Sequence, residues 1–305
     1  MGKRSRQGGG LSRRQTLASG VVAAAGLAAL GAGVVLRQPD AVGGSAAAKD
    51  TPSPTPSPTP DYFAEAKTRI EAYVTQTGGR IAIGVRDLLT TTDLTVGTRH
   101  FQTASIVKVD ILSSLLLRLQ DQGGQLTASD RERARKMIVI SDNDSATALF
   151  NKIGGVSGLT AANKKLGLTE TKPDVHWGMT STTAADQIRL LETITSTDGP
   201  LEASNRELIL DLMSQVDSEQ RWGIPAAATA ATTDVFVKNG WVQDDANKLR
   251  WQVNSIGRLV EPGHDWLVAV LSDDHVKQTD GIKLVEQVAK YTLDELRTLP
   301  PVALP

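Results

Sequence analysis

The proline tract at residues 51–60 is the feature that most constrains how this chain folds. Every second residue from Pro52 to Pro60 is proline, with serine or threonine between them. Proline lacks a backbone N–H and fixes φ, so this spacing excludes helix and sheet and favours an extended polyproline II linker. We therefore assign residues 49–60 to a linker and expect one folded domain over residues 61–305.

The segment before the linker has the pattern of an export signal. Residues 1–48 contain six lysines or arginines and one acid, and the 20 residues at 17–36 form an uncharged run rich in Ala, Gly, Val and Leu. The twin arginines at 13–14 resemble a twin-arginine export signal. The run is long enough to span a bilayer, whereas the small residues at 45–48 suit cleavage. We expect export across the cytoplasmic membrane, which leaves the protein either secreted or anchored at the outer face of the membrane or cell wall.

Charge and cysteine content narrow the classes of partner. Beyond residue 48 the chain carries 27 basic residues (33 minus 6) and 33 acidic residues (34 minus 1). An acidic domain without a basic, aromatic-rich stripe argues against nucleic-acid binding. The chain contains no cysteine, so we expect neither disulfides nor a lipid attached through an N-terminal cysteine. We expect a monomer that meets the membrane only through its N-terminal segment.

Hydrophobic periodicity predicts a mixed α and β fold for the domain. Helical patterns are expected over 61–76, over most of 105–216 and over 281–296. Strand patterns are expected over 80–86, 92–96, 234–238, 249–259 and 266–271. The strands come from both ends of the domain, so the sheet must be assembled from distant parts of the chain around a helical insert.

A candidate nucleophile and a candidate general base lie together in the predicted helical region. Ser105 and Lys108 form the only S-x-x-K pattern in the chain, directly ahead of an apolar run. If residues 105–120 are helical, the two side chains share a face, with Cβ atoms about 5–6 Å apart. A lysine whose pKa is lowered by burial can take the serine proton, which is the chemistry of acyl transfer. A lone S-x-x-K is more often a helix-start serine and a surface lysine, so other residues must support this chemistry.

Two further motifs follow in the chain. The triplet Ser-Asp-Asn at 141–143 lies between two predicted helices, and the triplet Lys-Asn-Gly at 238–240 ends a predicted strand. With S-x-x-K ahead of them, these motifs resemble those of the serine β-lactamase and penicillin-binding protein superfamily, and class A β-lactamases most closely, in which the third motif is K-T-G. The resemblance covers nearly all of residues 61–305. It implies an α/β (α+β) fold, in which an antiparallel sheet is flanked by N- and C-terminal helices beside an all-α lobe.

The resemblance also implies roles for four polar side chains. Ser105 would attack the substrate carbonyl and carry the acyl group, while Lys108 would accept the serine proton. Ser141 would pass a proton toward the leaving nitrogen. Lys238 would place positive charge near Ser141 and the substrate carboxylate. The implied substrates are small molecules, either β-lactams or peptidoglycan-like amides and esters, and no cofactor is implied.

Four further residues are implied to contact the substrate. Asn143 would hold the side-chain amide of the substrate, and the backbone N–H groups of Ser105 and Trp241 would form an oxyanion hole. Asn239 and Gly240 complete the third motif beside them. Asn239 replaces the hydroxyl residue that, in the family, donates to the substrate carboxylate. An amide can also donate, but it is longer and differently shaped.

The loop between Gly167 and Thr180 departs from the class A pattern. Class A enzymes carry a longer loop here, with an E-x-x-L-N segment whose glutamate activates the deacylating water, and no residue of this chain matches it. Glu170, Asp174 and His176 are the titratable alternatives. Without a positioned base, hydrolysis of the acyl-enzyme slows by a factor of roughly 10² to 10⁴.

Three functions therefore stay open at this point. They are a serine hydrolase of β-lactamase type, a cell-wall D-Ala-D-Ala peptidase or transpeptidase, and a non-catalytic module that binds the wall or a ligand. The four histidines of the chain show no metal-ligand spacing, so no metal site is predicted.

Overall fold

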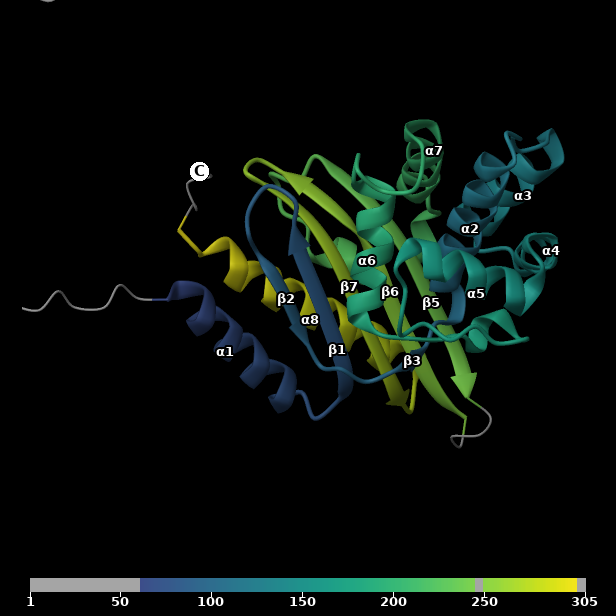
Figure 1. The fold of residues 1–305 in the computed structure, drawn as a ribbon. Helices are drawn as coiled ribbons and strands as arrows, with labels where there is room; N and C mark the ends of the chain where they lie inside the picture. Colours follow the sequence, from purple (N-terminus) through teal and green to yellow (C-terminus); the bar gives the residue numbers. More distant parts are fainter. Residues whose placement is uncertain (1–60, 245–248, 301–305) are drawn as a thin grey trace, which may run out of the picture. The chain divides into compact units, whose positions relative to one another are not determined.

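A five-stranded antiparallel sheet is the centre of the folded domain (Figure 1). The computed structural model describes residues 61–244 and 249–300. The strand order is β2-β1-β7-β6-β5, and every neighbouring pair is antiparallel. The strands are β1 (Arg80–Asp87), β2 (Asp93–Val96), β5 (Asp234–Asp244), β6 (Arg250–Glu261) and β7 (His264–His275). Strands from both ends of the domain share one sheet, and the predicted fold class is confirmed.

Strand β5 is longer than the sequence pattern predicted, and this moves the third motif. Pairing with β6 continues past Lys238, with Asn239 opposite Ser255 and Trp241 opposite Val253. The motif therefore lies inside an edge strand, and its predicted position at a strand end was wrong. Because side chains alternate along a strand, Lys238 faces one side of the sheet while Asn239 and Trp241 face the other.

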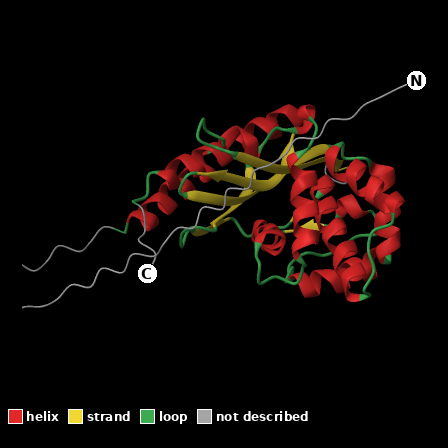
Figure 2. Cartoon of the chain, turned by 90° about the horizontal axis from the view of Figure 1, so that it is seen from above, coloured by secondary structure: helices red, strands yellow, loops and turns green. Residues whose placement is uncertain are grey.

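The first and last helices cover one face of the sheet. Helix α1 (Tyr62–Gln76) packs on α8 (Gln278–Arg297), and α8 packs on β6 and β7. The rings of Tyr73 and Tyr291 stack with centroids 3.9 Å apart. Figure 2 shows these helices on the opposite side of the strands from the remaining helices.

The remaining helices form the all-α lobe on the other side. Its α-helices are α2 (Val107–Asp121), α3 (Ala128–Val139), α4 (Asn143–Ile153), α5 (Gly155–Leu166), α6 (Ala184–Thr195) and α7 (Ala203–Ser214). Every residue of α2 from Val107 to Leu117 is buried, so this helix is the axis of the lobe. A helix apolar enough to be buried on all sides places whatever lies at its N-terminus inside the molecule.

Short elements connect the lobe to the sheet. Four 3₁₀ turns are described: η1 (Ala104–Ile106), η2 (Trp177–Met179), η3 (Ser218–Gln220) and η4 (Ile224–Ala227). Strand β3 (Phe101–Gln102) pairs with β4 (Ser181–Thr182) just before η1. Ser105 lies in η1, and α2 begins at Val107, two residues later than predicted.

The N-terminal predictions fall outside the described residues. The expected export signal at 1–48 and linker at 49–60 therefore stay predictions. Among the helices that the structure describes, none is long and apolar enough to cross a membrane.

Candidate active site

Ser105 is held where η1 meets the edge strand β5. A Cβ on Gly240 would lie 2.6 Å from the backbone nitrogen of Ser105 and 2.8 Å from the carbonyl oxygen of Thr103, so only glycine allows this approach. Ala104, directly before the nucleophile, has φ of 47°. Left-handed backbone is strained for alanine and is found preferentially at functional sites. The close contact fixes the backbone of a half-buried Ser105 beside the strand.

Lys108 lies in the first turn of α2 and is completely buried. Its Nζ donates to the backbone oxygen of Ser141 at 2.6 Å, to Ser141 Oγ at 3.0 Å and to Asn143 Oδ1 at 2.7 Å. Burial lowers the pKa of Lys108 from 10.5 to about 7, against the opposing negative charge of Asp142. An amine with this pKa exchanges its proton near neutral pH, as a general base must.

Ser141 connects the two lysines. It lies between α3 and α4 with φ of 57°, another strained residue at the site. Its Oγ accepts hydrogen bonds from Lys108 at 3.0 Å and from Lys238 at 3.1 Å. Asp142 caps α4 by accepting from the backbone N–H of Ser145 at 2.7 Å, which fixes the start of that helix.

Lys238 is also completely buried. Its Nζ donates to the backbone oxygen of Asn239 at 3.0 Å as well as to Ser141. Burial, and then the positive charge of Lys108, holds the pKa of Lys238 well below its usual range. Both lysine pKa values are lowered, so the neutral amines of this cluster can accept a proton from a reacting group.

The structure therefore brings together residues that are distant in sequence. Ser105, Lys108, Ser141 and Lys238 come from η1, α2, the α3–α4 connection and β5. One predicted detail differs. In the described part of the chain no hydrogen bond joins Ser105 Oγ to Lys108 Nζ, whose donors point to Ser141 and Asn143 instead.

Asn239 has neighbours that the sequence did not predict. Its side chain is completely buried, and Nδ2 donates to the backbone oxygens of Gln220 at 2.7 Å and Trp222 at 2.8 Å. A carboxamide has two N–H donors, and both are used here. Asn239 therefore has no N–H left to donate to a substrate carboxylate.

Trp177 is a residue of the site that sequence reasoning missed. Its ring centroid lies 5.0 Å from Lys108 Nζ, and its Nε1 donates to Thr147 Oγ1 at 3.1 Å. It belongs to the loop in which the glutamate motif is absent. An indole over the amine covers Lys108 on one side and limits its access to water. A tryptophan inside a shortened loop was the only signal in the sequence.

The three candidate bases in this loop have other neighbours. Glu170 is exposed and lies 3.4 Å from His100 Nε2. Asp174 accepts from the backbone N–H of His176 at 2.8 Å, and the His176 side chain is exposed. Within residues 61–244 and 249–300, none of the three makes a hydrogen bond or ion pair with Ser105, Lys108 or Ser141.

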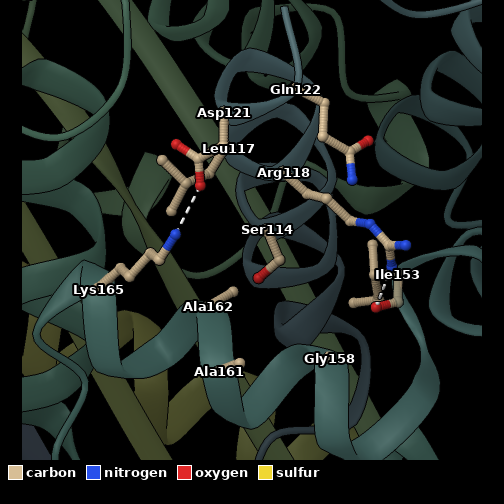
Figure 3. Close-up of a pocket in the computed structure, with 10 residues that line it drawn as sticks. All are labelled: Ser114, Leu117, Arg118, Asp121, Gln122, Ile153, Gly158, Ala161, Ala162 and Lys165. Atoms are coloured by element: carbon tan, nitrogen blue, oxygen red, sulfur yellow. Dashed lines mark hydrogen bonds and ion pairs between the residues drawn. The ribbon is translucent and has the colours of Figure 1, made fainter. Parts of the chain in front are cut away.

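A separate cavity of about 280 Å³ lies between α2 and α5 (Figure 3). Arg118 and the Lys165–Asp121 ion pair, 2.6 Å long, border it, and Ser114 points into it. None of the predicted site residues lines this cavity, which is therefore distinct from the Ser105 site. No group of three His, Asp or Glu side chains placed to bind a metal occurs among the described residues.

Comparison with known proteins adds family and fold. The sequence model described as the β-lactamase enzyme family matches residues 119–296. This match includes the 141–143 and 238–240 motifs and begins after Lys108. The putative lipoprotein LppW of Mycobacterium tuberculosis (strain ATCC 25618 / H37Rv) is 28% identical over 192 residues, 59% of this chain and 60% of the relative, and LppW of Mycobacterium bovis matches equally. The match thus spans about three fifths of the length of these relatives.

Solved structures share the fold at low sequence identity. The TLA-1 extended-spectrum β-lactamase aligns with a TM-score of 0.68 and 18% identity, covering 77% of this chain and 99% of its own. The protein PBP-A aligns with a TM-score of 0.66 and 19% identity, covering 77% and 97%. A class A β-lactamase from Mycobacterium abscessus aligns with a TM-score of 0.64 and 21% identity, covering 76% and 100%.

Proposed function

Because the chain belongs to the β-lactamase enzyme family, we propose that it is a serine hydrolase that forms an acyl-enzyme on Ser105 with β-lactams or related amides and esters. One observation carries the proposal. Lys108, one turn beyond Ser105, is a buried amine whose pKa is lowered to about 7 and whose Nζ contacts Ser141. Perturbed pKa values cluster at functional sites, and a general base needs a pKa near the working pH.

The proposed chemical steps begin at Ser105. Ser105 Oγ attacks the substrate carbonyl carbon as Lys108 takes its proton. The backbone N–H groups of Ser105 and Trp241 stabilise the resulting oxyanion. When the C–N or C–O bond breaks, the proton moves from Lys108 through Ser141 to the leaving atom. The product is an ester of Ser105, and the Lys108 amine is neutral again.

Release of the acyl group is proposed to be slow. Trp177 lies over Lys108, and Glu170 faces His100. Asp174 accepts from the backbone N–H of His176, and the His176 side chain is exposed. Water attack without a positioned base loses a factor of roughly 10² to 10⁴. The adduct is therefore expected to persist long enough to be observed.

A wall peptidase is the second candidate. A persistent ester is what transfer to an amine would need, and the same fold occurs in PBP-A, of which a mutant has been solved as an acyl-enzyme complex with penicillin G. A non-catalytic module that binds the wall or a ligand is the third candidate, favoured only if Ser105 proves unreactive.

We further propose that residues 61–305 form the catalytic domain of an exported protein in the cell envelope. The relatives from Mycobacterium are named putative lipoproteins, which supports an envelope location. The apolar segment at 17–36 would then serve either as a membrane anchor or as a cleaved signal.

Incubation with a penicillin tests the proposal. We expect intact mass spectrometry to show one covalent adduct on the protein and none on Ser105→Ala. Hydrolysis of a chromogenic cephalosporin then separates the candidates. Catalytic turnover, even when slow, indicates a lactamase, whereas an adduct with no turnover at all indicates a peptidase or a binding module. If no adduct forms, both enzyme hypotheses, the hydrolase and the peptidase, fail for this substrate class.

A further inference from the structure

Asn239 fastens a loop to the edge strand beside the site. Its two N–H groups donate to the backbone oxygens of Gln220 and Trp222, while its Oδ1 is buried without a hydrogen-bond partner among the described atoms. A buried acceptor without a partner destabilises the fold. The two N–H donations are therefore what this amide contributes.

The loop at residues 220–224, which we call the latch, is fixed at further points. The N–H of Ile224 donates to Ser255 Oγ at 3.0 Å, and the N–H of Gly223 donates to Glu286 Oε1 at 3.4 Å. Gly223 has φ of 80°, and a Cβ there would lie 2.4 Å from Ser255 Oγ. These hydrogen bonds hold the latch in a fixed position against the sheet.

The latch brings a second indole to the strand that contacts Ser105. The rings of Trp222 and Trp241 are 5.9 Å apart and inclined at 57°. Trp241 follows Gly240, the residue packed against the Ser105 backbone. Both indoles are partly exposed, so they form an apolar surface that a bound molecule can reach.

Two described cations of this region, Arg221 and Lys238, have hydrogen-bond partners within the protein. Arg221, the cation of the latch, donates to the backbone oxygens of Ser214 at 2.7 Å and Val235 at 3.5 Å. Lys238 is buried and faces the other side of the strand, toward Ser141. The groups paired with Asn239 and Trp241 on β6 are Ser255 and Val253, both uncharged.

We propose that Asn239 is a positioning residue that holds the latch, and that Trp222 and Trp241 make this side of the site select acyl donors with an uncharged, apolar group in place of a carboxylate. The inference rests on the proposed function, since it concerns the substrate of the same Ser105. A carboxylate placed against the indoles loses its water without gaining N–H donors. An apolar group in that place buries area against two rings.

Benzylpenicillin and its methyl ester are matched probes, because they differ only in the methyl group that replaces the negative charge of the carboxylate. Acylation of Ser105 is followed by intact mass with the full chain. We expect the methyl ester to react at least about tenfold faster than the free acid. An equal or faster reaction of the free acid overturns the inference and leaves the proposed function standing. If neither compound forms an adduct, the proposed function fails and the inference fails with it.

Asn239→Thr tests the positioning role. Threonine cannot reach both carbonyls, and it provides a hydroxyl donor. The ratio of the methyl ester rate to the free acid rate is therefore expected to fall about tenfold. The ratio is the readout because poor folding slows both reactions equally. Asn205→Thr is the matched control: Asn205 contacts Gln120, at the far end of α2 from Ser105, and the ratio should not change. An unchanged ratio in Asn239→Thr removes Asn239 from the proposal.

Trp241→Ala tests the apolar surface with the Asn239 amide intact. The half-saturating concentration of the methyl ester is expected to rise about tenfold. The backbone N–H of residue 241 is retained, so the oxyanion contact is unaffected. A large fall in the limiting rate with unchanged half-saturation contradicts a binding role for the indole.

Discussion

The pH dependence of acylation is the sharpest test of Lys108 as the base. Only the neutral amine can take the Ser105 proton, so the acylation rate follows the neutral fraction of Lys108. With a pKa of about 7, half of the amine is neutral at pH 7. At the ordinary pKa of 10.5, only about 0.03% would be neutral at that pH. Burial in this site therefore increases the available base by about a thousandfold.

The expected profile has a defined sign and midpoint. Below the midpoint, the second-order rate of penicillin acylation should rise about tenfold for each pH unit, and above it the rate should level off. Rates are measured by intact mass between about pH 5.5 and pH 9.5, with Ser105→Ala as the blank. A midpoint above about pH 9 refutes the argument that burial prepares this lysine.

Two variants identify the titrating group, because a histidine could also give a midpoint near neutral pH. Trp177→Ala removes the indole 5.0 Å from Nζ and admits water, so the midpoint should move to higher pH. Asp142→Asn removes the negative charge that raises the pKa of Lys108, so the midpoint should move to lower pH. Asparagine still caps α4. A midpoint that stays fixed in both variants excludes Lys108 as the base.

Three further predictions concern neighbouring features. Gly240→Ala places a Cβ 2.6 Å from the Ser105 nitrogen and should slow acylation by about 100-fold or more, measured by intact mass; a rate within twofold of the native protein would contradict the close packing. Burial raises the pKa of Asp110 to about 7, so the folded protein holds this proton more tightly than the unfolded chain and stability falls as pH rises from about 4 to 7. Asp110→Asn should then raise Tm more at pH 8 than at pH 4.5, and an equal gain at both would contradict the assignment. Glu170→Gln should leave the lifetime of the penicillin adduct within about twofold, because Glu170 faces His100; a much longer lifetime would identify it as the deacylation base.

The strands and helices were largely predictable because each is a local pattern. The alternation at 80–86 appears as β1, and the apolar run after Ser105 appears as α2. Boundaries were less predictable. Strand β5 continues through the polar third motif because β6 offers a partner at every position to Asp244. The apolar run of β5 ends before Lys238, but its backbone pairing with β6 continues to Asp244.

The contacts of the site could not be predicted in the same way. The sequence contains Asn239, but its amide could have faced a substrate; that it holds Gln220 and Trp222 depends on the path of the latch. Trp177 gave no motif, and it reaches Lys108 only because η2 packs on η1. Each contact joins two separate segments of the chain, and the sequence does not show that these segments lie close together in space.

The sequence by itself determined the order of the polar motifs and the mixed α and β fold, because residue identity and periodicity are properties of single segments. The tertiary structure decided whether those motifs are chemically poised. Lys108, Ser141 and Lys238 become one cluster only when α2, the α3–α4 connection and β5 pack together and exclude water. Desolvation is a property of the surrounding atoms, so the pKa of about 7 at Lys108 exists only in the folded protein.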